Sequence, residues 1–231
     1  MIEVKGVTKT YGRKQNAFVA LKNVSFEIPD ATSVAILGKS GSGKSTLMHA
    51  MSGLDRPEKG QIVIDGVDIL QLKTKAVDKF RSQKIGFIFQ AFFVQANESA
   101  FDNVALPLEI NRIGIRKRRQ QAEETLRLVG LEDKIKQKAR NLSGGQKQRL
   151  AIARAIVTQP RIIFADEPTG NLDSTTGAQI EKLLFDLNKK QGSTLVIVTH
   201  DSELAAKCDM QIYIKDGKIE KITQPKKGRK K

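Results

Sequence analysis

The sequence lacks several features, and each absence excludes a class of protein. Its single cysteine, Cys208, cannot form an internal disulfide bond, which excludes a disulfide-built scaffold. The first residues, Met1–Val4, lack the basic and then apolar pattern of a secretory signal, so a cytoplasmic address is expected. The longest apolar stretches, such as 162–165 and 195–198, are far shorter than the ~20 residues that cross a bilayer. If the protein serves a membrane, we expect it to do so from outside the bilayer.

Low-complexity tracts and internal repeats are also absent, which excludes a largely disordered chain. The chain has 231 residues, of which 39% are hydrophobic and 28% charged, and this is enough for one large globular domain. We therefore expect one compact folded unit.

Acidic residues are outnumbered: 40 Lys and Arg against 25 Asp and Glu give a formal net charge of +15. Such a charge attracts anionic surfaces, and both nucleic acid and anionic lipid qualify. Much of the excess lies in the run 116–119 and in a tail without acidic residues. The basic residues of that tail are Lys221, Lys226, Lys227, Arg229, Lys230 and Lys231. Two interpretations stay open for both segments, a solvated helix end or chain terminus and a contact with lipid headgroups near a membrane partner.

Hydropathy patterns predict strands and helices in alternation. Residues 1–30 alternate apolar and polar positions, which indicates an antiparallel β-ribbon. Further strands are expected at 34–37, 61–69, 85–89, 162–165 and 195–198, helices at 44–52 and 175–190, and a short helix with a hairpin at the end. Strands that alternate with helices imply a parallel sheet. We predict a single α/β domain over 1–231, with a mixed-sheet core at about 1–90 and 160–222, an N-terminal antiparallel β subdomain, an inserted helical subdomain at about 91–159 and a basic tail at 223–231.

A phosphate-binding loop is predicted directly after the strand at 34–37. Residues Gly38–Ser45 fit the pattern G-x-x-x-x-G-K-[ST] between a buried strand and a helix. Glycines let successive N–H groups point at phosphate oxygens, and the helix N-terminus adds its positive dipole end. A loop that only turns the chain has no need for Lys44 and Ser45, which we expect at the β- and γ-phosphates and at Mg²⁺. The expected nucleotide contacts on this P-loop NTPase (RecA-like) core are Gly38, Lys39, Ser40, Gly41, Ser42, Gly43, Lys44, Ser45 and Thr46.

Two carboxylates follow the apolar stretch 162–165. Asp166 can hold Mg²⁺, and Glu167 can polarise a water molecule against the γ-phosphate of ATP. A plain acidic strand end is the alternative, and the presence of the loop at 38–45 argues against it. These two motifs alone permit a kinase, a GTPase or a motor.

Residues Leu142–Gln146 decide among these classes. They match the signature LSGGQ and continue as Lys147–Arg149, so the sequence resembles an ATPase of the ABC transporter family. The resemblance covers nearly the whole chain, because counterparts of the family's other elements follow in the expected order. Ser143 and Gln146 also form a capping-box pattern at a helix start, and both interpretations can hold.

The resemblance implies roles for several single residues. Tyr11 resembles the aromatic residue that stacks on adenine, and His200 resembles the switch histidine that holds the γ-phosphate and the attacking water. Gln90 resembles the Q-loop glutamine, which senses the γ-phosphate, and Asp173 ends a segment that resembles the D-loop. The implied catalytic residues are Glu167, His200, Lys44 and Gln90, and the implied metal ligands are Ser45, Gln90 and Asp166.

The resemblance also implies partners. In the family, the signature binds the γ-phosphate of a nucleotide held by the opposite subunit, which here involves Ser143, Gly145 and Gln146. One chain carries one loop and one signature, so an ATP-dependent homodimer is expected. A separate transmembrane permease is expected to contact residues 91–101, with the protein bound peripherally at the cytoplasmic face of the membrane. ATP and Mg²⁺ are the implied cofactors, and no nucleic acid is expected.

The segment Glu167–Asp173 resembles the MacB and LolD group, which covers lipoprotein-release, macrolide-export and cell-division ATPases. Asn103–Leu108 is also similar to that group. Two features depart from it. Residues 91–98 replace an apolar segment with leucines and a proline, which leaves permease and cargo open, and Lys39 stands where proline is common in the family.

Three other functions are open to a chain with these motifs. An ABC-type head of a nucleic-acid machine would suit the basic charge, but such heads carry coiled-coil or zinc-bearing insertions that this chain lacks. A translation-type factor needs two cassettes in one chain. A regulatory subunit without hydrolysis is disfavoured because Glu167 and His200 are both present.

Overall fold

The computed structural model describes residues 1–224, which fall into two compact units. The first unit holds Met1–Asp78 and the chain from Thr194 onward, and the second holds Lys79–Ser193. Residues 225–231, which make up most of the predicted tail 223–231, lie outside the described residues, and so does the lipid contact left open for that tail. Within residues 1–224, no helix combines the length and the apolar character that a membrane crossing needs. The predicted single domain with a core and a helical insertion stays a prediction.

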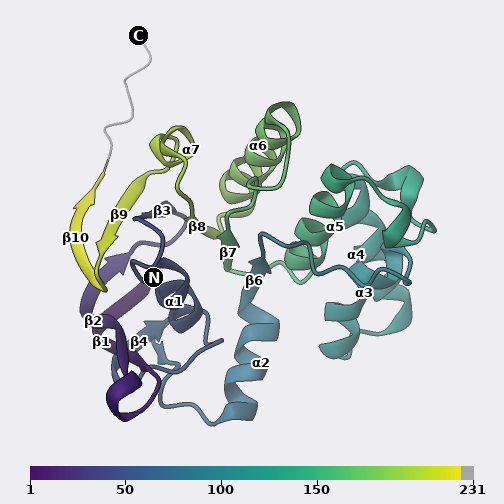
Figure 1. Ribbon diagram of the computed structural model, residues 1–231. Coiled ribbons are helices and arrows are strands. Elements are labelled where there is room, and N and C mark those ends of the chain that lie inside the picture. Colours follow the sequence, from purple (N-terminus) through teal and green to yellow (C-terminus); the bar gives the residue numbers. More distant parts are fainter. Residues whose placement is uncertain (225–231) are drawn as a thin grey trace. The chain divides into compact units, whose positions relative to one another are not determined.

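An antiparallel sheet in the order β2-β1-β4-β5 forms one part of the first unit (Figure 1). Its strands are β1 (Ile2–Tyr11), β2 (Phe18–Ile28), β4 (Lys59–Ile64) and β5 (Val67–Asp68), and a 3-10 turn, η1 (Lys14–Asn16), joins the first two. The predicted antiparallel ribbon is confirmed. The strand expected over 61–69 is a hairpin, because Asp65 and Gly66 take φ angles of 50° and 78° that suit a two-residue turn.

The other strands of the first unit lie side by side in the order β10-β9-β3-β8. Strand β3 (Ser33–Leu37) pairs in parallel with β8 (Thr194–Val198) and β9 (Met210–Lys215), and β10 (Lys218–Thr223) is antiparallel to β9. Every residue of β3 and β8 is buried, which explains the continuous apolar runs 34–37 and 195–198 within them. Helix α1 (Lys44–Met51) follows β3, and α7 (Ser202–Ala206) follows β8. Because β3 and β8 run parallel, the loops after them leave the same edge of the sheet.

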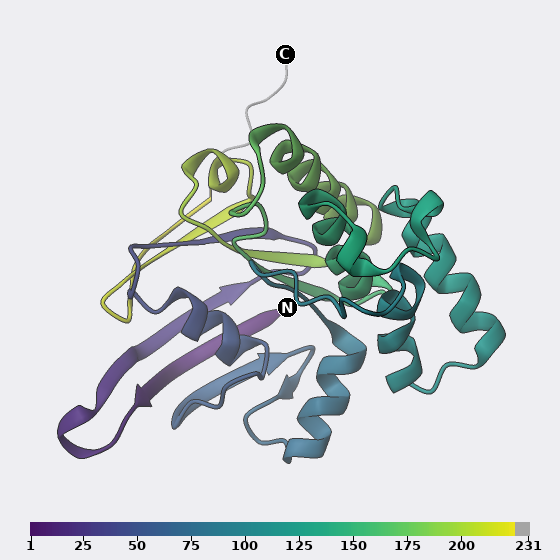
Figure 2. The same ribbon diagram turned by 45° about the vertical axis from the view of Figure 1, so that its right-hand side comes forward.

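The second unit contains a parallel strand pair and a helical cluster. Strand β6 (Ile85–Ile88) pairs with β7 (Ile162–Asp166). Helices α3 (Ala100–Ile110), α4 (Ile115–Leu128) and α5 (Gly144–Ile156) pack on one another (Figure 2), and α6 (Ser174–Gln191) packs on α5. Two 3-10 turns, η2 (Glu132–Lys134) and η3 (Ala139–Asn141), connect α4 to α5. These helices account for the helical pattern predicted over 91–159.

Two features differ from the prediction. Helix α2 (Thr74–Lys84), which crosses the boundary between the units in sequence, was not expected, because none of its residues is buried and it lacks a continuous apolar stripe. The helical pattern also begins later than position 91. Residues 91–99 are not helical, and α3 starts at a capping box in which Ser99 and Asp102 satisfy each other's backbone N–H groups.

Candidate nucleotide-binding site

The loop between β3 and α1 closes around the side chain of Lys44. The Lys44 ammonium donates hydrogen bonds to the carbonyl oxygens of Gly38 and Lys39, each at 2.9 Å. Gly41 and Gly43 take φ angles of 75° and 105°, which favour glycine. The loop therefore has the tight, glycine-dependent turn that the motif requires.

A cavity of about 560 Å³ lies beside this loop in the first unit, lined by residues 38–42, 213–216 and Glu220. The Ser42 hydroxyl is buried and has no hydrogen-bond partner among residues 1–224. A buried hydroxyl without a partner is costly, and an anion with several acceptor oxygens would satisfy it. Gly38 leaves no space for a side chain, because a Cβ there would lie 2.3 Å from the Ile214 carbonyl oxygen. Both observations fit a loop shaped for a bound phosphate.

Two further predicted residues belong to the first unit. Tyr11 ends β1, and its side chain is 41% exposed. His200 is exposed and follows β8, where the Thr199 N–H donates to the Ile36 carbonyl oxygen at 3.3 Å. Asp201 then caps α7 by accepting hydrogen bonds from two backbone N–H groups. The neighbouring parallel strands β3 and β8 thus bring the loop at 38–45 and His200 to one sheet edge.

The second unit gathers three other predicted residues. Glu167 directly follows β7 and has a φ of 41°, which is uncommon outside glycine. A Cβ placed on Gly170 would lie 3.3 Å from Gln90 Nε2 and 3.4 Å from Glu167 Oε2, so these two side chains converge on that glycine. Asn171 donates from Nδ2 to the Gln90 carbonyl oxygen at 2.9 Å. The segments after β6 and β7 are therefore joined, with Asp166 at the end of β7.

The signature residues form the N-terminus of α5. The Ser143 hydroxyl accepts from the Gln146 N–H at 3.3 Å, and the Gln146 side chain accepts from the Ser143 N–H at 3.0 Å. The capping box expected from the sequence is therefore present. Asp173 caps α6 in a similar way, and hydrogen bonds from the Thr176 backbone and hydroxyl hold the pKa of its carboxyl below the usual value.

A comparison with protein families matches residues 21–170 to the model described as "ABC transporter". The chain belongs to the ABC transporter family. This match covers the loop at 38–45, the signature and the carboxylates Asp166 and Glu167. The chain is an ATP-binding subunit of an ABC transporter and an ATPase, as the sequence predicted.

Several relatives of this ABC subunit match over nearly their whole length. "Lipoprotein-releasing system ATP-binding protein LolD" of Syntrophus aciditrophicus is 41% identical over 219 residues, 95% of this chain and 98% of the relative. "Uncharacterized ABC transporter ATP-binding protein MJ0796" of Methanocaldococcus jannaschii is 44% identical over 225 residues, 96% of each chain. A solved dimeric structure of MJ0796 bound to ADP and Pi has a TM-score of 0.89, 42% identity and covers 97% of this chain and 98% of that one. The alternative of a nucleic-acid machine gains no support.

Gly145 of the ABC signature lies against α6. A Cβ there would lie 2.6 Å from the Cγ2 methyl group of Thr176, whereas a Cβ on the neighbouring Gly144 would meet only Phe92, at 4.0 Å. Threonine is stiff at χ1, so its methyl group has little freedom to move away. The signature glycine thus has a packing role in addition to any role in binding.

This contact leads to a stability prediction. We expect Gly145→Ala to lower the free energy of unfolding by about 1–3 kcal/mol relative to Gly144→Ala, because of the overpacked contact. Adding Thr176→Ser, which removes the methyl group, should restore most of the loss. Urea denaturation of the three variants measures this. Equal stability of the two alanine variants would contradict the predicted clash.

Gln148 shows what the motifs did not reveal. This side chain on α5 is buried, and its Nε2 donates to the Pro168 carbonyl oxygen at 2.6 Å, one residue after Glu167. The signature helix is thereby tied to the segment that carries the predicted base. Gln148 belongs to the run Lys147–Arg149 after the signature, but a single glutamine gives no sign of a partner twenty residues away.

The predicted metal ligands are a hydroxyl, an amide oxygen and a carboxylate, from Ser45, Gln90 and Asp166. These are hard oxygen donors of the kind that Mg²⁺ prefers, so the set fits the ion chemically. Ser45 belongs to the first unit and the other two to the second. Within residues 1–224, no three or more His, Cys, Asp and Glu side chains form a group that could hold a metal ion.

Proposed function

We propose that two copies of this ABC subunit enclose two ATP molecules and drive a separate membrane permease of the MacB/LolD type. Each chain carries one loop closed around Lys44 and one capped, glycine-containing N-terminus of α5, and this observation supports the proposal. A helix N-terminus with free N–H groups attracts a phosphate. The solved MJ0796 cassette, similar over nearly all of both chains, is described as dimeric and bound to ADP and Pi.

In this proposal, the residues predicted from the motifs act on the bound nucleotide. Lys44 and the loop at 38–46 hold the phosphates, and Tyr11 stacks on adenine. Glu167 accepts the proton of the attacking water, while His200 holds that water and the γ-phosphate in line. Ser45, Gln90 and Asp166 would hold Mg²⁺, which would supply positive charge to the phosphate oxygens. Ser143 and Gly145 of the second copy close the site.

The permease contact is proposed for residues 91–101. Phe93 is 66% exposed and takes a φ of 46°. Arg154 on α5 holds this segment by donating to the carbonyl oxygens of Phe93 at 2.7 Å and Phe92 at 3.3 Å, and burial lowers the pKa of its guanidinium. An exposed aromatic side chain on a braced loop suits a protein interface. A subunit bound to such a permease would lie peripherally at the cytoplasmic face of the membrane, which is the location we propose.

The proposal predicts a concentration-dependent ATPase. Because each complete site needs two chains, the hydrolysis rate per chain should rise with protein concentration and then level off. Replacing Ser143 with arginine should remove this rise while leaving nucleotide binding to the single chain in place. Steady-state phosphate release over a dilution series measures the rise in the unmodified chain and its loss in Ser143→Arg. A rate per chain that is independent of concentration in a protein shown to be monomeric would contradict the shared site.

A further inference from the structure

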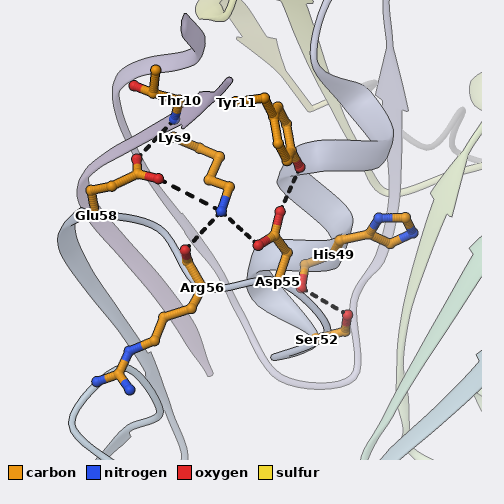
Figure 3. A network of polar contacts seen from close by, with 8 residues as sticks. All are labelled: Lys9, Thr10, Tyr11, His49, Ser52, Asp55, Arg56 and Glu58. Atoms are coloured by element: carbon orange, nitrogen blue, oxygen red, sulfur yellow. Dashed lines mark hydrogen bonds and ion pairs between the residues drawn. The ribbon is translucent and has the colours of Figure 1, made fainter. Parts of the chain in front are cut away.

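Tyr11 is held by an acidic side chain that no motif contains (Figure 3). Its hydroxyl donates to Asp55 Oδ2 at 2.5 Å, and the other carboxylate oxygen, Oδ1, accepts from the Lys9 ammonium at 2.6 Å. Lys9 and Tyr11 are two residues apart on β1 and therefore point to the same side of the strand. Asp55 thus joins both side chains.

Lys9 is fixed from several directions. Its ammonium also donates to the Arg56 carbonyl oxygen at 2.9 Å and lies 3.6 Å from a Glu58 carboxylate oxygen. The side chain is 11% exposed, and its nitrogen lies 5.0 Å from the centroid of the Tyr11 ring. A cation at this distance interacts with the face of the ring. One face of Tyr11 is therefore covered by Lys9.

The same network ties the ring to the phosphate-binding helix. Asp55 lies just after α1, and its N–H donates to the His49 carbonyl oxygen at 3.1 Å. Helix α1 begins at Lys44, so the Tyr11 ring is connected through Asp55 to the helix that starts in the phosphate loop.

The protonation states of Tyr11 and Asp55 agree with the hydrogen bond between them. Burial raises the pKa of Tyr11, and the hydrogen bond to Asp55 raises it further, so the hydroxyl stays a donor. Burial also acts to raise the pKa of Asp55, but hydrogen bonds from Lys9 and Tyr11 outweigh it and leave that pKa below the usual value. The ionised carboxylate therefore accepts from both neighbours at neutral pH.

We propose that Lys9 and Asp55 are positioning residues for the nucleotide base. This inference rests on the proposed function, in which Tyr11 stacks on adenine. Lys9 occupies one face of the ring, so the base takes the other face, and Asp55 sets the distance between the ring and the phosphate loop. Because the ring is ordered before the nucleotide arrives, less conformational entropy is lost on binding.

The test compares a ligand that has a base with one that has none. The full chain is titrated by calorimetry with ADP and with inorganic tripolyphosphate. Tyr11→Phe keeps the ring and loses the hydroxyl, and Asp55→Ala removes the acceptor. We expect each to raise the Kd for ADP about three- to tenfold, the size of one hydrogen bond, with tripolyphosphate affinity unchanged. The double variant should be no weaker than the weaker single variant, because both changes remove the same bond.

The control is Glu3→Ala, which breaks an ion pair with Lys5 on the same strand, 2.5 Å long, and should bind both ligands as the unmodified chain does. If Tyr11→Phe and Asp55→Ala bind ADP normally while Lys44→Met loses both ligands, the inference is overturned and the proposed function stands. An equal loss of both ligands in the two variants would also overturn it. An unmodified chain that binds neither ligand would instead overturn the proposed function.

Discussion

Replacing Glu167 with glutamine lowers the kcat of ATP hydrolysis by about 10²- to 10⁴-fold, the range associated with loss of a general base. Glutamine keeps the shape of the side chain but accepts no proton from water. Glu167 Oε2 lies close to Gly170, and the amide of glutamine has the same length and can take the same position. ATP binding should therefore persist, and single-turnover hydrolysis separates the two steps.

The matched control for this change is Asp186→Asn on α6. Asp186 also loses a charge there, but it belongs to an exposed pair with Lys182 at 2.8 Å, which contributes little. The Asp186→Asn protein should hydrolyse ATP at the rate of the unmodified chain. If Glu167→Gln hydrolyses ATP at that same rate, then Glu167 is not the base.

Replacing Lys44 with methionine weakens nucleotide binding roughly 10- to 150-fold, the loss expected for a hydrogen bond to a charged group. Methionine fills the same space without the ammonium that now bridges two loop carbonyl groups. The loop is thus affected as well as the phosphate contact. Lys22→Ala removes a positive charge from exposed surface on β2 and serves as the control. Titration with ADP measures both, and normal ADP affinity in Lys44→Met would contradict the assignment of the loop.

The sequence predicted those parts of the fold in which local pattern and burial agree. The fully buried strands β3 and β8 and the glycine loop before α1 were all found where expected. Helix α2 was missed because its residues are partly or fully exposed and leave no periodic signal. The hairpin between β4 and β5 was missed because the Asp65–Gly66 turn is short enough to look like one continuous alternation.

In the candidate site, the sequence likewise predicted some residues and missed others. Motifs located Lys44, Glu167 and the signature, because each lies in a run of consecutive residues with a recognisable pattern. The side chains that hold them come from elsewhere: Asp55 lies 44 residues from Tyr11, and Gln148 lies 20 residues from Pro168. Such partners depend on which segments the fold places together, and a single sequence carries no signal for that.

The central claim is that ATP is enclosed between two copies of the chain, and the Glu167→Gln protein tests it most directly. Because this variant binds ATP without hydrolysing it, the paired state should accumulate. Sedimentation velocity with ATP and Mg²⁺ should show a dimer, which ADP fails to support and which Ser143→Arg abolishes. A protein that stays monomeric with saturating ATP, alone and in the presence of its permease, would contradict the account.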